Sequence, residues 1–249
     1  MLVITGTFGE FLKGRTALVT GGTSRIGAAI GQGLAAAGAQ VAVTGVSQAE
    51  VSAAKTDAEF GGQCAEILDV RDADAVNSLI GSFSKLDVLV NCAGAIRRGA
   101  EHDPEVFHQV VDINLNGTMR CCAAARPLLQ QSGGAIVNIA SMLSFFGGGL
   151  VPGYAASKGG VAQLTKSLAI AYAPDTIRVN AVAPGWIATP LTQALQGDLS
   201  RSQPIIDRTP MKRWGRPDDI PGAVAFLCSP AAAFITGTIL PVDGGYLIS

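Results

Sequence analysis

A tyrosine and a lysine stand four residues apart in the segment GYAASKGGVAQL, residues 153–164. Residues at i and i+4 lie on one face of a helix, so Tyr154 and Lys158 can project into the same cleft. A free phenol has a pKa of about 10, too high for an acid or base at neutral pH, and a neighbouring ammonium favours the phenolate. The spacing therefore predicts a tyrosine that exchanges a proton with a substrate and a lysine that lowers its pKa.

A serine upstream strengthens this signal, which is weak alone because a lysine that snorkels beside an interfacial tyrosine has the same spacing. Ser141 stands thirteen residues before Tyr154, at the end of the apolar run AIVNIA. A hydroxyl can both donate and accept a hydrogen bond, and we expect this one to bind the same substrate oxygen as the tyrosine. The three residues together predict acid–base chemistry at that oxygen.

The passage TGGTSRIGAAIGQGLAAAG, which begins at the end of the apolar run TALVT (16–20), predicts an anion site. Glycines between a strand and a helix let the backbone approach a pyrophosphate, and the helix N-terminus offers free N–H groups and a favourable dipole. A plain strand-to-helix connection is the alternative. The residues expected around a dinucleotide are Gly21, Thr23, Ser24, Arg25, Ile26 and Gly27.

Short β-rich runs alternate with helix-length stretches along the whole chain. The runs are 16–20, 40–44, 64–68, 87–91, 134–140, 177–182 and 238–242, and the stretches include 28–37, 104–129, 154–172 and 217–227. This alternation predicts an α/β fold, a doubly wound parallel (Rossmann) sheet with helices on both faces, in a single domain. The segment from about 190 to 214 breaks the alternation, and we expect a lid or insertion near the substrate.

Composition excludes several classes of protein. The chain has 249 residues, 48% hydrophobic and 15% charged, which is too apolar for disorder and long enough for a sizeable core. The net charge of −1 and the scattered basic residues argue against nucleic acid as a partner. The five cysteines lack metal-ligand spacing, so we expect reduced thiols and no metal. Because no leader pattern or bilayer-length apolar run is present, we expect a cytoplasmic protein without a membrane partner.

The motifs together resemble the short-chain dehydrogenase/reductase family over nearly the whole chain. Residues 20–27 are similar to its TGxxxGxG cofactor loop, and NCAG (91–94) is similar to its NNAG motif. Asn114 in DINLNG, with Ser141, Tyr154 and Lys158, matches its four catalytic residues in order and spacing. The resemblance implies reversible hydride transfer between a secondary alcohol carbon and a nicotinamide, with Tyr154 as base or acid. Lys158 would also hold the cofactor ribose, and Asn114 would support a water that links the lysine to solvent.

Arg25 departs from this pattern, because it stands at the middle glycine of the cofactor loop. If that position needs a positive φ, an arginine costs about 1 kcal/mol. Alternatively its side chain pairs with a phosphate. At the end of the second strand Gly45 and Val46 replace the acid of NAD users and the arginine of NADP users, so the choice between NAD and NADP stays open.

The resemblance implies further cofactor contacts. Asp69 and Val70 would contact adenine, although a turn at a strand end is the alternative for Asp69, and Asn91, Ala93 and Gly94 would shape the cleft. In APGWIAT (183–189), the residues expected to border the nicotinamide are Pro184, Gly185, Ile187 and Thr189.

Residues 93–98, 139–158 and 213–220 are most similar to one group within the family, the 2-dehydro-3-deoxy-D-gluconate 5-dehydrogenases, also called 2-deoxy-D-gluconate 3-dehydrogenases. That similarity implies a deoxy sugar acid as the small-molecule substrate. Arg97 or Arg98 could then grip its carboxylate, with two solvated loop arginines as the alternative. Trp186 would frame the pocket.

Two other functions remain open. A 3-oxoacyl-carrier-protein reductase uses the same scaffold but would need a basic patch for its acidic carrier, and no clear patch is visible in the sequence. A nicotinamide-sensing scaffold without turnover is suggested only by Arg25. The resemblance also implies a homotetramer, with the helices of 104–131 and 154–172 as its contacts.

Overall fold

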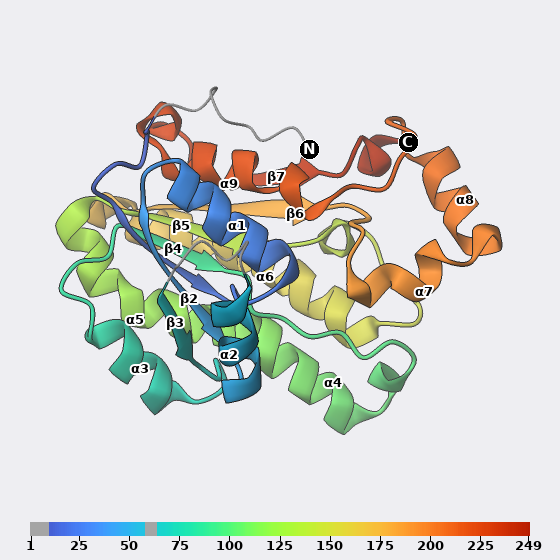
Figure 1. Cartoon of the computed structure of the whole chain (residues 1–249), viewed down its shortest axis with the longest axis horizontal. Helices are drawn as coiled ribbons and strands as arrows, with labels where there is room; N and C mark the ends of the chain where they lie inside the picture. Colours follow the sequence, from blue (N-terminus) through green and yellow to red (C-terminus); the bar gives the residue numbers. More distant parts are fainter. Residues whose placement is uncertain (1–9, 58–63) are drawn as a thin grey trace.

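The computed structural model describes residues 10–57 and 64–249, so the first nine residues of the N-terminus in which a leader was sought lie outside it. Seven strands form one parallel sheet in the order β3-β2-β1-β4-β5-β6-β7 (Figure 1). They are β1 (Thr16–Thr20), β2 (Gln40–Gly45), β3 (Cys64–Ile67), β4 (Val88–Asn91), β5 (Ala135–Ile139), β6 (Arg178–Pro184) and β7 (Ile239–Val242). The predicted doubly wound sheet is confirmed. Its strand order reverses between β1 and β4, which opens a crevice at their carboxyl ends.

Helices cover both faces of this sheet. The α-helices of the described residues are α1 (Arg25–Ala36), α2 (Gln48–Thr56), α3 (Ala73–Gly81), α4 (Pro104–Val111), α5 (Gly117–Ser132), α6 (Pro152–Tyr172), α7 (Gln193–Gln196), α8 (Leu199–Arg208) and α9 (Pro221–Cys228). Successive strand residues point to opposite faces. Val19 packs in one core layer with Ile30 of α1 and Val224 of α9, whereas Leu18 packs in the other with Leu129 of α5.

Some elements differ from the expected ranges. The stretch 104–129 is not one α-helix, because a π-helical turn (Asp112–Asn116) separates α4 from α5. Helix α6 begins at Pro152, whose fixed φ suits a first helical turn, rather than at Tyr154. The 190–214 segment contains α7 and α8, which project from one end of the molecule in Figure 1.

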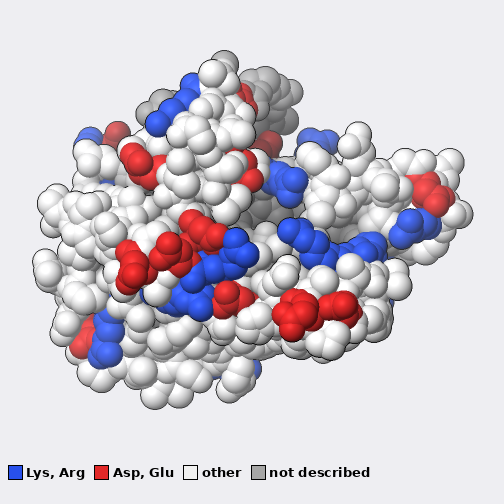
Figure 2. Space-filling model, turned by 90° about the horizontal axis from the view of Figure 1, so that it is seen from below, with Lys and Arg blue, Asp and Glu red and all other residues white. Residues whose placement is uncertain are grey.

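Two findings bear on the excluded classes. Within residues 10–57 and 64–249, no helix is both long and apolar enough to cross a bilayer, and no group of three His, Cys, Asp or Glu side chains could hold a metal ion. Figure 2 shows basic and acidic side chains close together on one face of the molecule.

Candidate active site

The loop between β1 and α1 contacts the end of β4 through bare backbone. Gly21 has φ +65°, and a Cβ built on it would lie 2.7 Å from the Ala93 Cα. A Cβ on Gly27 would collide with the main-chain oxygen of Gly21. Ser24, the N-cap residue of α1, makes no side-chain capping bond, so the first N–H groups of α1 have no acceptor from it. A helix N-terminus with uncapped N–H groups can bind an anion, so this loop fits a dinucleotide pyrophosphate.

Arg25 adopts φ +59°, the left-handed conformation that the middle glycine of the family motif would favour. The conditional cost expected for an arginine therefore applies, at about 1–2 kcal/mol. Arg25 is exposed at the start of α1, where its guanidinium could pair with a phosphate.

At the end of β2, Gly45 packs against the β1–α1 loop. A Cβ on Gly45 would lie 2.8 Å from the Thr23 Oγ1, so no acidic side chain fits there unless Thr23 moves. Ser47 is engaged as the N-cap of α2, where its Oγ accepts from the Glu50 N–H at 3.3 Å. The Glu50 carboxylate accepts from the Val46 N–H at 2.9 Å.

Two residues expected to line the cofactor cleft have partners within the protein. Asp69 binds the Arg71 guanidinium, with an Oδ2 to Nη2 distance of 2.6 Å, and this hydrogen bond lowers the pKa of the Asp69 carboxyl. Asn91 turns into the core, where its amide donates to the Asn138 Oδ1 at 2.9 Å and its own oxygen has no partner. Only the backbone of Asn91 is therefore left to meet a cofactor. The Val70 side chain packs beneath Gly117.

Ser141, Tyr154 and Lys158 meet beyond the carboxyl end of β5. Ser141 directly precedes a 3-10 turn and hydrogen-bonds the Tyr154 side chain. Tyr154 lies in the first turn of α6 and Lys158 in the next. The Lys158 Nζ donates to the Ile139 main-chain oxygen at 2.5 Å and lies 5.7 Å from the centre of the Tyr154 ring. The spacing thus brings all three side chains to one corner.

The pKa values in this corner differ from the sequence expectation. Burial raises the pKa of the Tyr154 phenol; the Ser141 hydrogen bond opposes this, whereas Cys92 and Glu101 add to it. Burial also lowers the pKa of Lys158 to about 8. Among the groups of the chain, the lysine does not produce the expected net lowering for the tyrosine, because desolvation penalises both charged forms.

Asn114 lies in the π-helical turn between α4 and α5 and joins two parts of the site. Its Oδ1 accepts from the Ala95 N–H at 2.7 Å, and its Nδ2 donates to the Ser157 Oγ at 2.9 Å. The Ser157 hydroxyl donates to the Tyr154 main-chain oxygen at 2.7 Å. Beside it, a Cβ on Gly94 would lie 3.3 Å from the Asn114 Oδ1. The Asn114 Nδ2 also donates to the Ala95 main-chain oxygen at 2.9 Å, so both N–H groups of the side-chain amide are engaged within the protein.

The segment after β6 is held between two other segments. The Gly185 N–H donates to the Val242 main-chain oxygen at 3.0 Å, and a Cβ on Gly185 would lie 2.6 Å from the Asp243 Cα. Ile187 is buried and pairs with Gly215. The other two residues expected at the nicotinamide are Pro184, which ends β6, and Thr189, whose N–H donates to the Thr192 Oγ1 at 3.1 Å.

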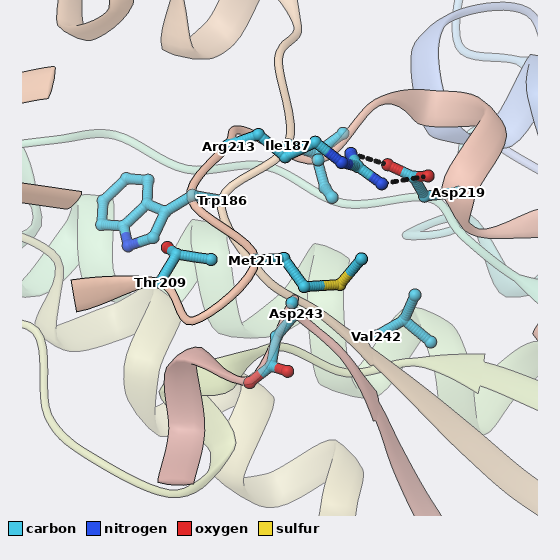
Figure 3. A pocket seen from close by; sticks show the side chains of 10 residues that line it. Trp186, Ile187, Thr209, Met211, Arg213, Asp219, Val242 and Asp243 are labelled. Atoms are coloured by element: carbon cyan, nitrogen blue, oxygen red, sulfur yellow. Dashed lines mark hydrogen bonds and ion pairs between the residues drawn. The ribbon is translucent and has the colours of Figure 1, made fainter. Parts of the chain in front are cut away.

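A cavity of about 180 Å³ lies beside this segment (Figure 3). Trp186 lines it and makes an edge contact with Trp214, with 5.8 Å between ring centres. The Trp186 Nε1 is buried without a hydrogen-bond partner, and Arg213 forms a fork with Asp219 on the opposite wall. None of Asn114, Ser141, Tyr154 and Lys158 lines this cavity.

The remaining predicted substrate residues, Arg97 and Arg98, lie exposed on the loop after β4. Among the residues that the structure describes, the Arg97 guanidinium reaches only the main-chain oxygen of Ile96, at 3.3 Å. One buried residue of this loop, Glu101, was missed by sequence reasoning. It binds the N–H of Tyr154 at 2.7 Å, and no motif distinguishes it from the exposed glutamates of the chain.

Comparison with known proteins agrees with this geometry. The family model described as Enoyl-(Acyl carrier protein) reductase matches residues 21–247. The chain therefore belongs to the short-chain dehydrogenase/reductase family, and it is an NAD(P)-dependent oxidoreductase that acts on CH–OH groups.

Particular relatives narrow the comparison. The chain is 42% identical to a 2-dehydro-3-deoxy-D-gluconate 5-dehydrogenase of Pseudoalteromonas atlantica, over 95% of this chain and 97% of that protein. It is 40% identical to a cis-4-hydroxycyclohexanecarboxylate dehydrogenase of Sinomonas cyclohexanicum, over 96% and 98%. The crystal structure of a gluconate 5-dehydrogenase from Burkholderia cenocepacia, in complex with NADP and tartrate, superposes with a TM-score of 0.90 at 33% identity, over 97% and 99%.

Proposed function

We propose that the protein oxidises a secondary hydroxyl of a deoxy sugar acid, or reduces the matching ketone, with NAD or NADP as hydride carrier. The observation that carries the proposal is the corner of Ser141, Tyr154 and Lys158 beside a loop with two exposed arginines. The names of the two relatives above support it, since each describes a dehydrogenase for a carboxylate compound.

The chain's own residues suit the binding of a nicotinamide dinucleotide. The β1–α1 loop would hold the pyrophosphate, Asp69 and Val70 would border the adenine, and the 184–189 segment would border the nicotinamide. Lys158 would hold the nicotinamide ribose. When bound, the cofactor supplies a carbon that accepts or donates hydride.

Tyr154 handles the proton in the proposed reaction. In oxidation its phenolate takes the proton of the substrate hydroxyl, and in reduction its phenol donates a proton to the developing alkoxide. Its raised pKa keeps the phenol protonated, as reduction requires, while the Ser141 hydroxyl orients the substrate oxygen and stabilises its charge. The main-chain oxygen of Asn114 accepts from the Thr118 hydroxyl at 2.8 Å, and we infer that Asn114 also supports the water expected beside Lys158.

The arginine loop would select the acid. A guanidinium can bind a carboxylate through two parallel hydrogen bonds, and both Arg97 and Arg98 are exposed. Because the loop follows β4, it starts at the same carboxyl edge of the sheet as the β5 corner.

A paired assay tests this function. NAD⁺ and NADP⁺ are each offered with deoxy sugar acids, simple polyols and 3-hydroxyacyl thioesters, and the absorbance of the reduced cofactor is followed. We expect turnover of a sugar acid and a higher KM for it in Arg97→Ala or Arg98→Ala. Turnover of thioesters alone would favour an acyl reductase, and cofactor binding without turnover would favour a sensor.

We also propose a cytoplasmic homotetramer. Free thiols throughout the described residues suit a reducing compartment. Ile170 on α6 is 79% exposed and Met119 on α5 is also exposed, which supports contacts through these two helices. Light scattering should give the mass of four chains, and Ile170→Asp should reduce it; a monomer in the unmodified protein would contradict the proposal.

A further inference from the structure

Glu101 is a buried acid beside the catalytic helix. Its side chain is 1% exposed, although it belongs to a short 3-10 turn (Ala100–His102) in the loop after β4. Among the described residues it takes part in no salt bridge. A buried carboxylate needs hydrogen-bond donors, because its desolvation is otherwise costly. Those donors indicate what the residue does.

The two carboxylate oxygens bind two segments that are far apart in the sequence. Oε1 accepts from the Arg97 N–H at 2.6 Å, and Oε2 accepts from the Tyr154 N–H at 2.7 Å. The Tyr154 N–H belongs to the first turn of α6, where backbone donors have no partner inside the helix. The N-cap residue of α6 is Val151, whose side chain cannot accept a hydrogen bond. Glu101 therefore caps α6 from outside, with the helix dipole in its favour.

Other contacts join the same two segments. The Gly99 N–H donates to the Leu150 main-chain oxygen at 2.7 Å, and the His102 Nε2 lies 2.9 Å from the Gly149 oxygen. A Cβ on Gly153 would lie 3.3 Å from the Glu101 Oε2, so the helix start lies close against the carboxylate. The arginine loop and the tyrosine thus form one connected unit, with Glu101 as its buried centre.

We propose that Glu101 is a positioning residue, which fixes Tyr154 relative to the Arg97 loop so that the phenol and the arginine act on one substrate molecule. The inference rests on the proposed function, in which Tyr154 transfers the proton and the arginine loop meets the carboxylate. Glu101 acts through the two N–H groups that it binds. A substrate with its carboxylate at a fixed distance from the reacting hydroxyl requires such a fixed geometry.

The charge of Glu101 gives this role a second signature. Four groups lie near the Tyr154 ring or act on the pKa of its phenol: Ser141 after β5, Cys92 after β4, Lys158 on α6 and Glu101 itself. After burial and the opposing Ser141 bond, Cys92 and Glu101 raise the pKa of the phenol. Removing the charge of Glu101 should therefore lower the pKa of Tyr154.

Two variants separate geometry from charge. Glu101→Gln keeps the size of the side chain but loses the charge and one acceptor, and we expect kcat to fall about 10- to 100-fold, as for other displaced catalytic groups. The pH of half-maximal kcat for alcohol oxidation should move to lower pH. Glu101→Asp keeps the charge but is too short to reach both N–H groups, so kcat should fall while this pH stays close to that of the unmodified enzyme.

The matched control is Glu105→Gln, which removes an exposed carboxylate from the first turn of α4. It should change neither kcat nor the pH profile. If Glu101→Gln resembles this control in kcat, or lowers kcat without moving the pH profile, the positioning role is overturned. If Glu101→Gln does not fold, the same role still requires Glu101→Asp to lose kcat without a pH shift, and unchanged kcat there overturns it.

Amide hydrogen exchange gives a readout without substrate. The N–H groups of Tyr154 and Arg97 should exchange faster in Glu101→Gln than in the unmodified protein or in Glu105→Gln. If exchange is faster in Glu101→Gln but the unmodified protein turns over no alcohol, the positioning role of Glu101 is supported and the proposed function is contradicted. Unchanged exchange at both N–H groups would overturn the positioning role of Glu101, whatever the substrate.

Discussion

The proposed catalytic corner and the proposed cofactor loop would serve the same reaction but are built in opposite ways. At the corner, polar side chains bind polar partners: Lys158 binds the Ile139 oxygen, Asn114 binds Ser157, and Glu101 binds Tyr154. At the loop, Gly21 and Gly27 bring backbone against backbone with no room for side chains. The geometry of the corner depends on hydrogen bonds of particular side chains, whereas the geometry of the loop depends on glycines that leave room for close backbone contact. Substitutions should therefore damage the two regions for different reasons.

Tyr154→Phe should give the largest effect and test the corner directly. The substitution removes one hydroxyl and little volume, so the fold and the cofactor loop should be retained. We expect kcat/KM to fall about 10³-fold, the size of a lost acid–base group. Steady-state kinetics measures the loss, and fluorescence of bound reduced cofactor should show affinity within a few-fold of the unmodified enzyme.

Ser144→Ala is the control for that experiment. The Ser144 hydroxyl donates to the Lys158 main-chain oxygen at 2.7 Å. The substitution therefore removes a hydroxyl from the same corner and leaves the Tyr154 phenol in place. A modest loss of stability, about 1 kcal/mol, is expected with most activity retained. Activity above a tenth in Tyr154→Phe would mean that another group moves the proton.

Gly27→Ala should disable the loop and leave the corner intact. The added methyl would collide with the Gly21 oxygen, so the loop must shift away from the pyrophosphate. We expect at least about 1–3 kcal/mol of lost stability from overpacking, with a large rise in the dissociation constant of the cofactor. Gly81→Ala is the matched control, since a Cβ there meets no atom within 4 Å. Equal cofactor affinity in both variants would contradict the bare-backbone description of the loop.

Lys158→Met should stabilise the protein while it abolishes turnover. Lys158 is 4% exposed, and its pKa of about 8 shows that burial disfavours its charge. Replacement should therefore raise the free energy of unfolding by about 2 kcal/mol at pH 7. The cost of the charge is fully present below pH 8 and is relieved as the pH rises from there towards the ordinary lysine pKa, so the gain should shrink over that range.

Urea unfolding at several pH values measures this gain. Lys166→Met, at an exposed position on the same helix, is the control and should show no such pH-dependent gain. A Lys158→Met protein less stable than the unmodified one at pH 7 would show that the hydrogen bond to Ile139 outweighs the burial of the charge.

The two regions also differ in how far the sequence predicts them. The alternation of runs predicts the sheet, and the i, i+4 spacing predicts that Tyr154 and Lys158 share a helix face, because both follow from local periodicity. Ser141 is predicted from its place at the end of a strand. Glu101 cannot be found in this way. Its burial depends on a contact between residues far apart in the chain, and a glutamate before an Asp-Pro helix start has no local signal of burial. The π-helical turn at Asn114 is hidden for the same reason, since the apolar periodicity of 104–129 fits one straight helix.

Arg25→Gly should give the smallest effect. It tests the one position of the cofactor loop where a side chain stands in place of the glycine of the family motif. Arg25 holds φ +59°, a conformation in which a side chain costs energy and glycine does not. If the loop is defined by missing side chains, the variant should gain about 1 kcal/mol of stability. Because the exposed guanidinium can pair with phosphate, NADP affinity should fall more than NAD affinity. Thr176→Gly, at φ +60° near the start of β6, should match the gain in stability without changing either affinity. Equal changes for both cofactors in Arg25→Gly would leave Arg25 as a strained residue without a partner on the 2′-phosphate.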